Sequence, residues 1–228
     1  MKPFFARLAA VLTGCLLCVS CLNDGDFYME NIAAFATVLQ GQLVTDAGAV
    51  LNVTEDQSGL ADWRQNGNRF LVVYDILNAD MDVRLRSLTP MQICRPTPED
   101  PALEQGQDPV YIGSASLGGS FLNLILGVYQ AKGSTLPQVF SCEYKDDPQR
   151  NQMFLILHCD GHQENPTTLP ADQLETVRGY CSIPLYELLK GISRNLNLVY
   201  DTTATLDDGS VVMVSDTLCQ AGNITVGF

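Results

Sequence analysis

The chain has 228 residues, of which 46% are hydrophobic and 17% are charged, and its formal net charge is −13 at pH 7. This length suits one large β domain or two small ones. The acidic balance argues against nucleic acid and against anionic membrane surfaces as ligands, because both would repel the protein. A basic partner would be attracted, although ordinary solubility explains the charge at least as well.

Residues 1–20 predict a lipoprotein signal peptide. Lys2 and Arg7 form a positive start, and the uncharged stretch 8–20 follows them. That stretch is too short to cross a bilayer as a helix, but it matches the apolar part of a signal peptide. A small serine directly precedes Cys21, as a lipoprotein signal peptidase requires, so Cys21 is the predicted lipidation site. Several acyl chains on one cysteine anchor a protein far better than a single chain.

Two alternatives stay open at this end of the chain. Cys15 follows Leu12-Thr13-Gly14, which is the better lipobox by residue type but leaves only a short apolar stretch before the cut. In the other alternative, a plain secretory signal contains an incidental cysteine. Residues 21–31 are predicted to be a polar, lipidated tether. No second long apolar run follows, so we expect the lipid to be the membrane attachment.

Alternation with a period of two dominates the chain from residue 32 onward. Between Asp82 and Arg86, Val83 and Leu85 are predicted to point inward, while the charged residues around them face water. Residues 69–77 are apolar on both faces, which indicates a strand covered on both sides. The side chains on its first face are Phe70, Val72, Tyr74 and Ile76.

Short turns join these strands into hairpins. Asp46-Ala47-Gly48 joins 32–44 to 49–54, and a similar turn at 78–80 joins the two strands described above. Several strands joined in this way within residues 32–95 predict a small barrel or a curled sheet.

The longer loop 57–67 holds Trp63, the only tryptophan. An aromatic ring in a polar loop can stack on a sugar or a peptide, so Trp63 is a candidate ligand-binding residue. The alternative is a ring that plugs the barrel, which is the more frequent role of a loop aromatic.

Residues 96–109 are predicted to be a linker, because they contain four prolines and acidic residues without periodicity. Alternation then returns, and Leu122, Leu124, Leu126 and Val128 share one face. Pro184–Gly191 has helical spacing of leucines, a proline near its start and a glycine at its end, which predicts a two-turn helix. The remaining strands of 110–228 predict a β-sandwich.

Besides Cys21, five cysteines follow at wide spacing, and an oxidising compartment would permit disulfides among them. The sequence leaves their connectivity open, and the odd number leaves at least one free thiol. They are Cys94, Cys142, Cys159, Cys181 and Cys219.

His158, Asp160 and His162 are the candidate metal ligands. On one face of a strand, two imidazoles and a carboxylate can bind zinc or iron. However, same-face residues on a strand lie ~6–7 Å apart, and this strand is predicted to end near Gly161. A polar strand end is therefore the preferred interpretation, and we expect no metal.

The sequence offers no clear catalytic pattern. A Gly-x-Ser-x-Gly elbow and phosphate-binding glycine loops are absent, and Gly118-Gly119-Ser120 precedes a strand rather than joining a strand to a helix. Carboxylates are plentiful, but nothing singles out a glycosidase pair. We therefore expect neither an enzyme nor a cofactor.

Five segments, which together span essentially the whole chain after the signal peptide, carry a resemblance to a known family: 20–28, 32–38, 108–112, 118–124 and 178–185. They resemble the NigD-like lipoprotein family. This resemblance implies an OB-like barrel followed by a β-sandwich on a lipid anchor, with no catalytic residues to transfer.

These observations favour an all-β, non-catalytic outer-membrane lipoprotein that binds a protein or peptide, with bacteriocin immunity as one form of that role. Its orientation, toward the cell surface or the periplasm, stays open. The alternative is a glycan-binding accessory of a surface uptake system, based on Trp63 and the sandwich. A third hypothesis is a metal-dependent enzyme built on the two histidines.

Overall fold

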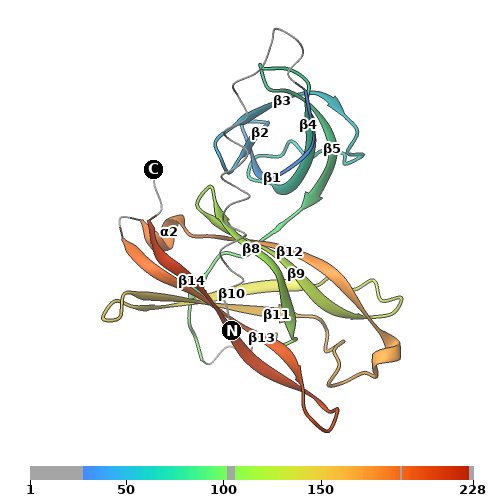
Figure 1. Cartoon of the computed structure of the whole chain (residues 1–228), viewed down its shortest axis with the longest axis vertical. Coiled ribbons are helices and arrows are strands. Elements are labelled where there is room, and N and C mark those ends of the chain that lie inside the picture. The colour runs from blue at the N-terminus through green and yellow to red at the C-terminus, as the bar shows by residue number, and fades with distance from the viewer. Residues whose placement is uncertain (1–27, 102–105, 191, 226–228) are drawn as a thin grey trace, which may run out of the picture.

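The computed structural model describes residues 28–101, 106–190 and 192–225, and side chains as far as residue 218. It is built almost entirely of strands, in a barrel followed by a two-sheet body (Figure 1). Over these described residues, the predicted all-β class with one short helix is confirmed. The predicted signal peptide, with Cys15 and Cys21, lies outside the described residues. In the part of the chain that is described, no helix has the length and apolarity to cross a membrane.

Five strands close the barrel in the order β1-β2-β3-β5-β4, with β4 hydrogen-bonded back to β1. Neighbouring strands run antiparallel except β3 and β5, which are parallel. A closed five-stranded barrel of this kind is OB-like, as expected. The strands are β1 (Met29–Leu39), β2 (Gln42–Thr45), β3 (Val50–Asp56), β4 (Arg69–Ile76) and β5 (Asp82–Pro90).

The barrel core follows the predicted alternation. Val83 and Leu85 are fully buried, and the predicted inner face of β4 is buried along its length. The outer face of β4 differs from the prediction, because Leu71 and Val73 are only half-buried on the outside of the barrel. The buried residues on that side are Arg69 and Asp75, whose ion pairs are described below.

The predicted strand 32–44 is in fact two strands. Gln40 and Gly41 form a tight turn between β1 and β2, and both have positive φ, 53° and 80° respectively. Such a pair matches the twist of a two-residue hairpin. The turn escaped prediction because glutamine is not a residue typical of positive φ.

The second body is a β-sandwich, as predicted. Its four-stranded sheet has the order β6-β12-β9-β8, and its five-stranded sheet the order β14-β13-β11-β10-β7. The first sheet consists of β6 (Gln92–Ile93), β12 (Leu174–Pro184), β9 (Phe121–Ala131) and β8 (Val110–Gly118). The second consists of β14 (Val211–Thr225), β13 (Ser193–Thr205), β11 (Gln152–Asp160), β10 (Val139–Asp147) and β7 (Thr97–Pro98).

The chain that leaves the barrel is bound to the sandwich at once. β6 pairs with β12 and β7 pairs with β10, both in parallel. β7 lies inside the stretch 96–109 that the prolines predict as a linker. A proline is tolerated at a sheet edge, where its missing N–H leaves no ladder bond unmade, and the N–H of Glu99 donates to the carbonyl of Tyr144 at 3.0 Å.

The sandwich core lies between the two sheets. The predicted inner face of β9 is at most 2% exposed, and it packs in one cluster with Leu155 and Leu157 of β11. The helix α2 (Tyr186–Leu189) is one turn rather than the predicted two, because Pro184 still belongs to β12. Its Leu189 is fully buried, so this short helix contributes to the core. A 3-10 turn at Ala171–Gln173 precedes β12.

Candidate functional site

The loop between β3 and β4 closes one end of the barrel and carries Trp63. Its indole N–H donates to Asp56 Oδ2 at 2.8 Å, and the backbone N–H of Ser58 donates to Asp56 Oδ1 at 2.9 Å. Burial raises the pKa of Asp56, but the hydrogen bonds from Ser58 and Trp63 outweigh it and lower that pKa overall. Asp56 therefore stays ionised and fixes the loop to the strand before it.

The ring of Trp63 is 4% exposed and belongs to the barrel core. The Arg64 guanidinium lies over the ring, 4.4 Å from its centre. Trp63 thus occupies the position of the plug described above. A direct contact between Trp63 and a ligand stays a prediction.

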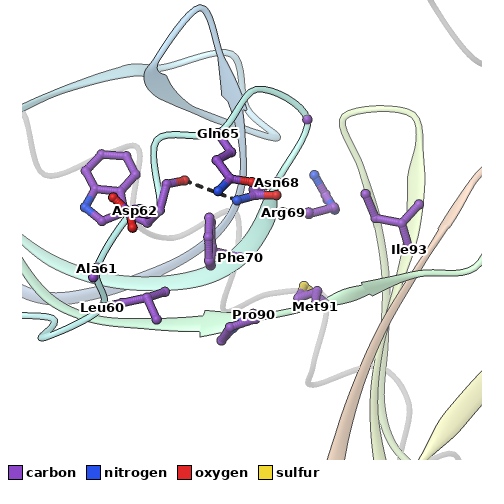
Figure 2. A pocket seen from close by; sticks show the side chains of 12 residues that line it. Leu60, Ala61, Asp62, Gln65, Asn68, Arg69, Phe70, Pro90, Met91 and Ile93 are labelled. Carbon is purple, nitrogen blue, oxygen red and sulfur yellow. Dashed lines mark hydrogen bonds between the residues drawn. The ribbon is translucent and has the colours of Figure 1, made fainter.

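A pocket of about 450 Å³ opens beside this loop, at the end of the barrel where β5 leaves for the sandwich. In Figure 2, Leu60, Pro90 and Met91 lie along its lower side, while Gln65 and Asn68 lie along its upper side. The other lining residues are Ala61, Asp62, Trp63, Gly67, Arg69, Phe70 and Ile93.

The pocket is apolar inside and polar at its rim. Phe70 and Met91 are buried at its base, whereas Asp62 and Gln65 are exposed at the loop. Asp62 has a φ of 54°, in the left-handed region that costs energy for a residue with a Cβ. Such a concave site suits an apolar group that enters from solvent.

Arg69 forms the inner boundary of the pocket, but its guanidinium is paired with groups inside the protein. Its side chain has no exposed surface, and its Nη2 lies 2.6 Å from Asp46 Oδ2. Its Nε donates to Ser182 at 2.8 Å, and Nη2 also donates to Asn123 at 2.7 Å. The guanidinium carbon lies 3.8 Å from the centre of the Phe121 ring. Arg69 therefore joins the barrel to the sandwich and is not offered to a ligand.

The glycines of 118–120 belong to this junction. A Cβ added to Gly119 would lie 2.5 Å from Asp46 Oδ1, and one added to Gly118 would lie 2.9 Å from the same side chain. Gly119 also has a φ of 54°. The turn between β8 and β9 therefore needs glycine in order to pack against the barrel, and its role is structural.

The structure brings His162 Nδ1 to 3.8 Å from Asp160 Oδ1, but it does not gather all three candidate metal ligands. His158 lies on β11, and its Nε2 is 3.1 Å from Glu143 Oε2 on the neighbouring strand. His162 lies in the turn after Asp160, and its Nε2 donates to the carbonyl of Pro137 at 3.1 Å. Within the described residues, no three His, Cys, Asp or Glu side chains form a group able to hold a metal ion.

A second pocket, of about 350 Å³, lies on the sandwich and was not foreseen from the sequence. Tyr111 and Tyr129 meet there edge to face, with ring centres 5.5 Å apart, and Tyr111 Oη lies 2.6 Å from Thr203 Oγ1. The three residues come from β8, β9 and β13, so alternation along one strand gives no signal for their meeting.

Most residues of the first pocket could not be predicted from the sequence, for a similar reason. Met91 and Ile93 follow a predicted strand and carry no motif, and they reach the pocket only because the chain turns from the barrel into β6. The long polar loop around the only tryptophan is the one signal that pointed to this end of the barrel.

Known proteins share this fold at low sequence identity. A NigD-like immunity protein from Bacteroides caccae has 22% identity and a TM-score of 0.58, and the match covers 82% of this chain and 91% of that one. A protein of unknown function from Bacteroides vulgatus has 17% identity and a TM-score of 0.59, covering 83% and 92%. A structure named "putative lipoprotein" from Bacteroides fragilis has 12% identity and a TM-score of 0.54, covering 82% and 97%.

No family model and no curated protein matches the sequence. The likeness to the solved structures establishes the fold, and it confirms the NigD-like resemblance at that level.

Proposed function

We propose that this chain, which shares the fold of a NigD-like immunity protein, is a non-catalytic lipoprotein of the outer membrane that binds a protein or peptide. Lipidation at Cys21 would supply the anchor, and no cofactor is required. A fold likeness to a structure named as a lipoprotein supports the anchored state. The immunity-like role takes its support from the first of the structures compared above.

The observation that carries the proposal is the pocket at the end of the barrel. Its volume of about 450 Å³ accommodates one or two apolar side chains, which is how anchoring residues bind at protein interfaces. The rim carries Asp62, and the whole chain has a net charge of −13. An apolar anchor flanked by lysine or arginine would therefore fit the pocket and be attracted toward it.

Ala61→Arg tests this use of the pocket. Ala61 is exposed at the rim, so a long cationic side chain would block the entrance and repel a basic partner without disturbing the core. We expect affinity for a partner captured from envelope extract or from a competitor's culture medium to fall about tenfold or more. The control is Ala79→Arg, an exposed alanine in the turn at the other end of β4. Equal affinity of the two variants would contradict the proposed site.

The immunity role has its own test. Deletion of the gene is expected to raise the sensitivity of the cell to a bacteriocin from a competing strain, and the unaltered gene on a plasmid should restore resistance. If sensitivity stays the same across a panel of such toxins, the immunity role is abandoned while partner binding can still be measured.

Glycan binding is the second candidate, and the tyrosine pocket on the sandwich favours it. Tyrosine rings beside threonine hydroxyls and Glu175 offer both a stacking face and polar groups for a sugar. The test is a glycan array with the unaltered protein and with Tyr111→Ala. Silence of both, or equal signals from both, would count against this candidate.

A further inference from the structure

Two cysteines that are far apart in the sequence lie side by side in the sandwich core. Cys94 follows β6, and Cys181 lies on β12, the strand that pairs with β6. The N–H of Cys94 donates to the carbonyl of Ser182 at 2.9 Å, so the backbone itself sets the two residues next to each other. Their Sγ atoms are 2.9 Å apart, and the residues are 3% and 0% exposed.

We propose that Cys94 and Cys181 form a disulfide when the chain folds in an oxidising compartment. A disulfide bond is about 2.05 Å long, so the sulfurs need to approach by less than one ångström. The strand pairing already holds both backbones in place. The bond would close a loop from residue 94 to residue 181, which includes β7 to β11.

The bond forms by thiol–disulfide exchange with a disulfide donor, either a small molecule such as oxidised glutathione or an oxidised dithiol protein. One protein thiolate attacks a donor sulfur and releases the first donor thiol. The second protein thiolate then displaces the other half of the donor. The donor takes up two electrons and the two protons, and the protein gains one S–S bond.

This exchange belongs to folding rather than to the finished structure. The hydrogen bond with Cys94 and burial raise the pKa of Cys181 well above its ordinary value, and neither thiol is open to solvent once the core has closed. A thiolate is the attacking species, so the donor must meet these cysteines while the chain still exposes them.

The two other described cysteines stay reduced under the same conditions. Burial raises the pKa of Cys159 to about 12, and it raises that of Cys142 further. Cys142 Sγ donates to the carbonyl of Glu143 at 3.4 Å, and Cys159 Sγ lies 3.9 Å from Gln138 Oε1. Cys94 Sγ also donates to an oxygen, the carbonyl of Phe140 at 3.3 Å, but it lies beside a second sulfur as well. Among the described residues, Cys142 and Cys159 have no such sulfur partner, so they serve as small apolar side chains of the core.

The bond would fasten the junction that Arg69 already holds. Cys181 directly precedes Ser182, which accepts from Arg69, and Cys94 comes four residues after the last residue of β5. The disulfide would thus tie the exit of the barrel to the strand that receives the buried arginine.

Trypsin separates every cysteine concerned, so a peptide map tests the proposal directly. Cys94 lies in the fragment 87–132, because the bond between Arg95 and Pro96 resists trypsin, and Cys181 lies in 179–190. The whole chain is reduced, unfolded and refolded with reduced and oxidised glutathione, and free thiols are alkylated before digestion. We expect the two fragments to run as one linked species under non-reducing conditions, with Cys142 alkylated in 133–145.

Stability supplies the second readout. Reduction of the bond should lower the thermal midpoint on the order of 10 °C, since the closed loop is long. Cys94→Ala should remove the linked species and the sensitivity to reduction, whereas the control Cys142→Ala should keep both. Alkylated Cys94 and Cys181 in the refolded unaltered chain, or a bond from Cys94 to Cys142, would overturn the proposal.

The same map, on protein recovered from whole cells after alkylation in the cell, tests where the bond forms. A bond found after refolding but absent from the cellular protein would keep the site and would contradict an oxidising envelope compartment as the location under "Proposed function". The two proposals can therefore fail separately.

Discussion

Asp75 shows how a single buried carboxylate is kept charged on the outer wall of the barrel. The N–H of Asn31 donates to its Oδ1 at 3.0 Å, and Arg86 Nη2 lies 2.6 Å from its Oδ2. Arg84 lies 3.6 Å from the same oxygen and also pairs with Glu55. The hydrogen bond from Asn31, followed by that from Arg86, lowers the pKa of Asp75 below its ordinary value.

A pH dependence follows from this lowered pKa. The stabilisation by Asp75 is complete above the unfolded pKa of about 3.9 and disappears as the pH falls through the lower, folded value. Asp75→Asn should therefore destabilise the protein clearly at pH 7, and the difference from the unaltered chain should shrink below about pH 4. Urea unfolding at pH 7 and pH 3 measures this difference in the free energy of unfolding, with Asp80→Asn in the exposed turn as control. A difference independent of pH would contradict the ionised pair.

At the scale of the element, the turn between β8 and β9 is fixed by contact rather than by its own conformation alone. Gly119 has a positive φ, as have several other turn glycines, but among the described positive-φ glycines it alone has a neighbour within 4 Å of an added Cβ. Gly209, in the turn between β13 and β14, has a φ of 83° and nothing within 4 Å of an added Cβ. A substitution at Gly209 therefore tests backbone strain alone, whereas a substitution at Gly119 tests strain together with collision.

Gly119→Ala should cost about 2 kcal/mol or more, because strain and collision with Asp46 add. Gly209→Ala should cost only about 1 kcal/mol, from strain alone. Chemical denaturation of both variants gives the comparison. Equal losses would mean that the turn can move away from the barrel without consequence.

At the scale of the whole molecule, the contacts of Arg69 join the barrel and the sandwich into one body. Arg69 comes from β4, whereas Asn123 and Ser182 come from β9 and β12 of the sandwich. A buried charge that is completely hydrogen-bonded is costly to leave unpaired, so separation of the two parts is opposed. Unfolding should therefore be a single transition.

Arg69→Ala should cost about 3–5 kcal/mol and split the thermal transition into two, one for each part. Differential scanning calorimetry measures both effects. The control is Arg64→Ala, which removes an exposed arginine from the face of Trp63 and should cost about 1 kcal/mol or less. A single transition in Arg69→Ala would show that the apolar contacts suffice.

The buried faces of the strands could be predicted from the sequence, whereas the junction between barrel and sandwich and the pocket could not. Alternation predicted the inner faces of β4, β5 and β9, because burial of every second side chain leaves a local pattern. The junction left no such pattern, since Arg69 finds its partners 54 and 113 residues away. Arg69 is the first residue of a predicted apolar strand, and nothing in the sequence indicated that its side chain is fully buried. The pocket was missed similarly, because it is assembled from a loop, two strand ends and the chain between the domains.

The buried arginine also limits how this architecture can be recombined. A barrel transferred to another protein would carry Thr37, Asp46 and Arg69 with it, but it would lose the acceptors that the sandwich supplies. A new host would have to present an amide and a hydroxyl at matching positions. Exchange of barrels between proteins of this fold should therefore succeed where residues equivalent to Asn123 and Ser182 are retained, whatever the rest of the surface looks like.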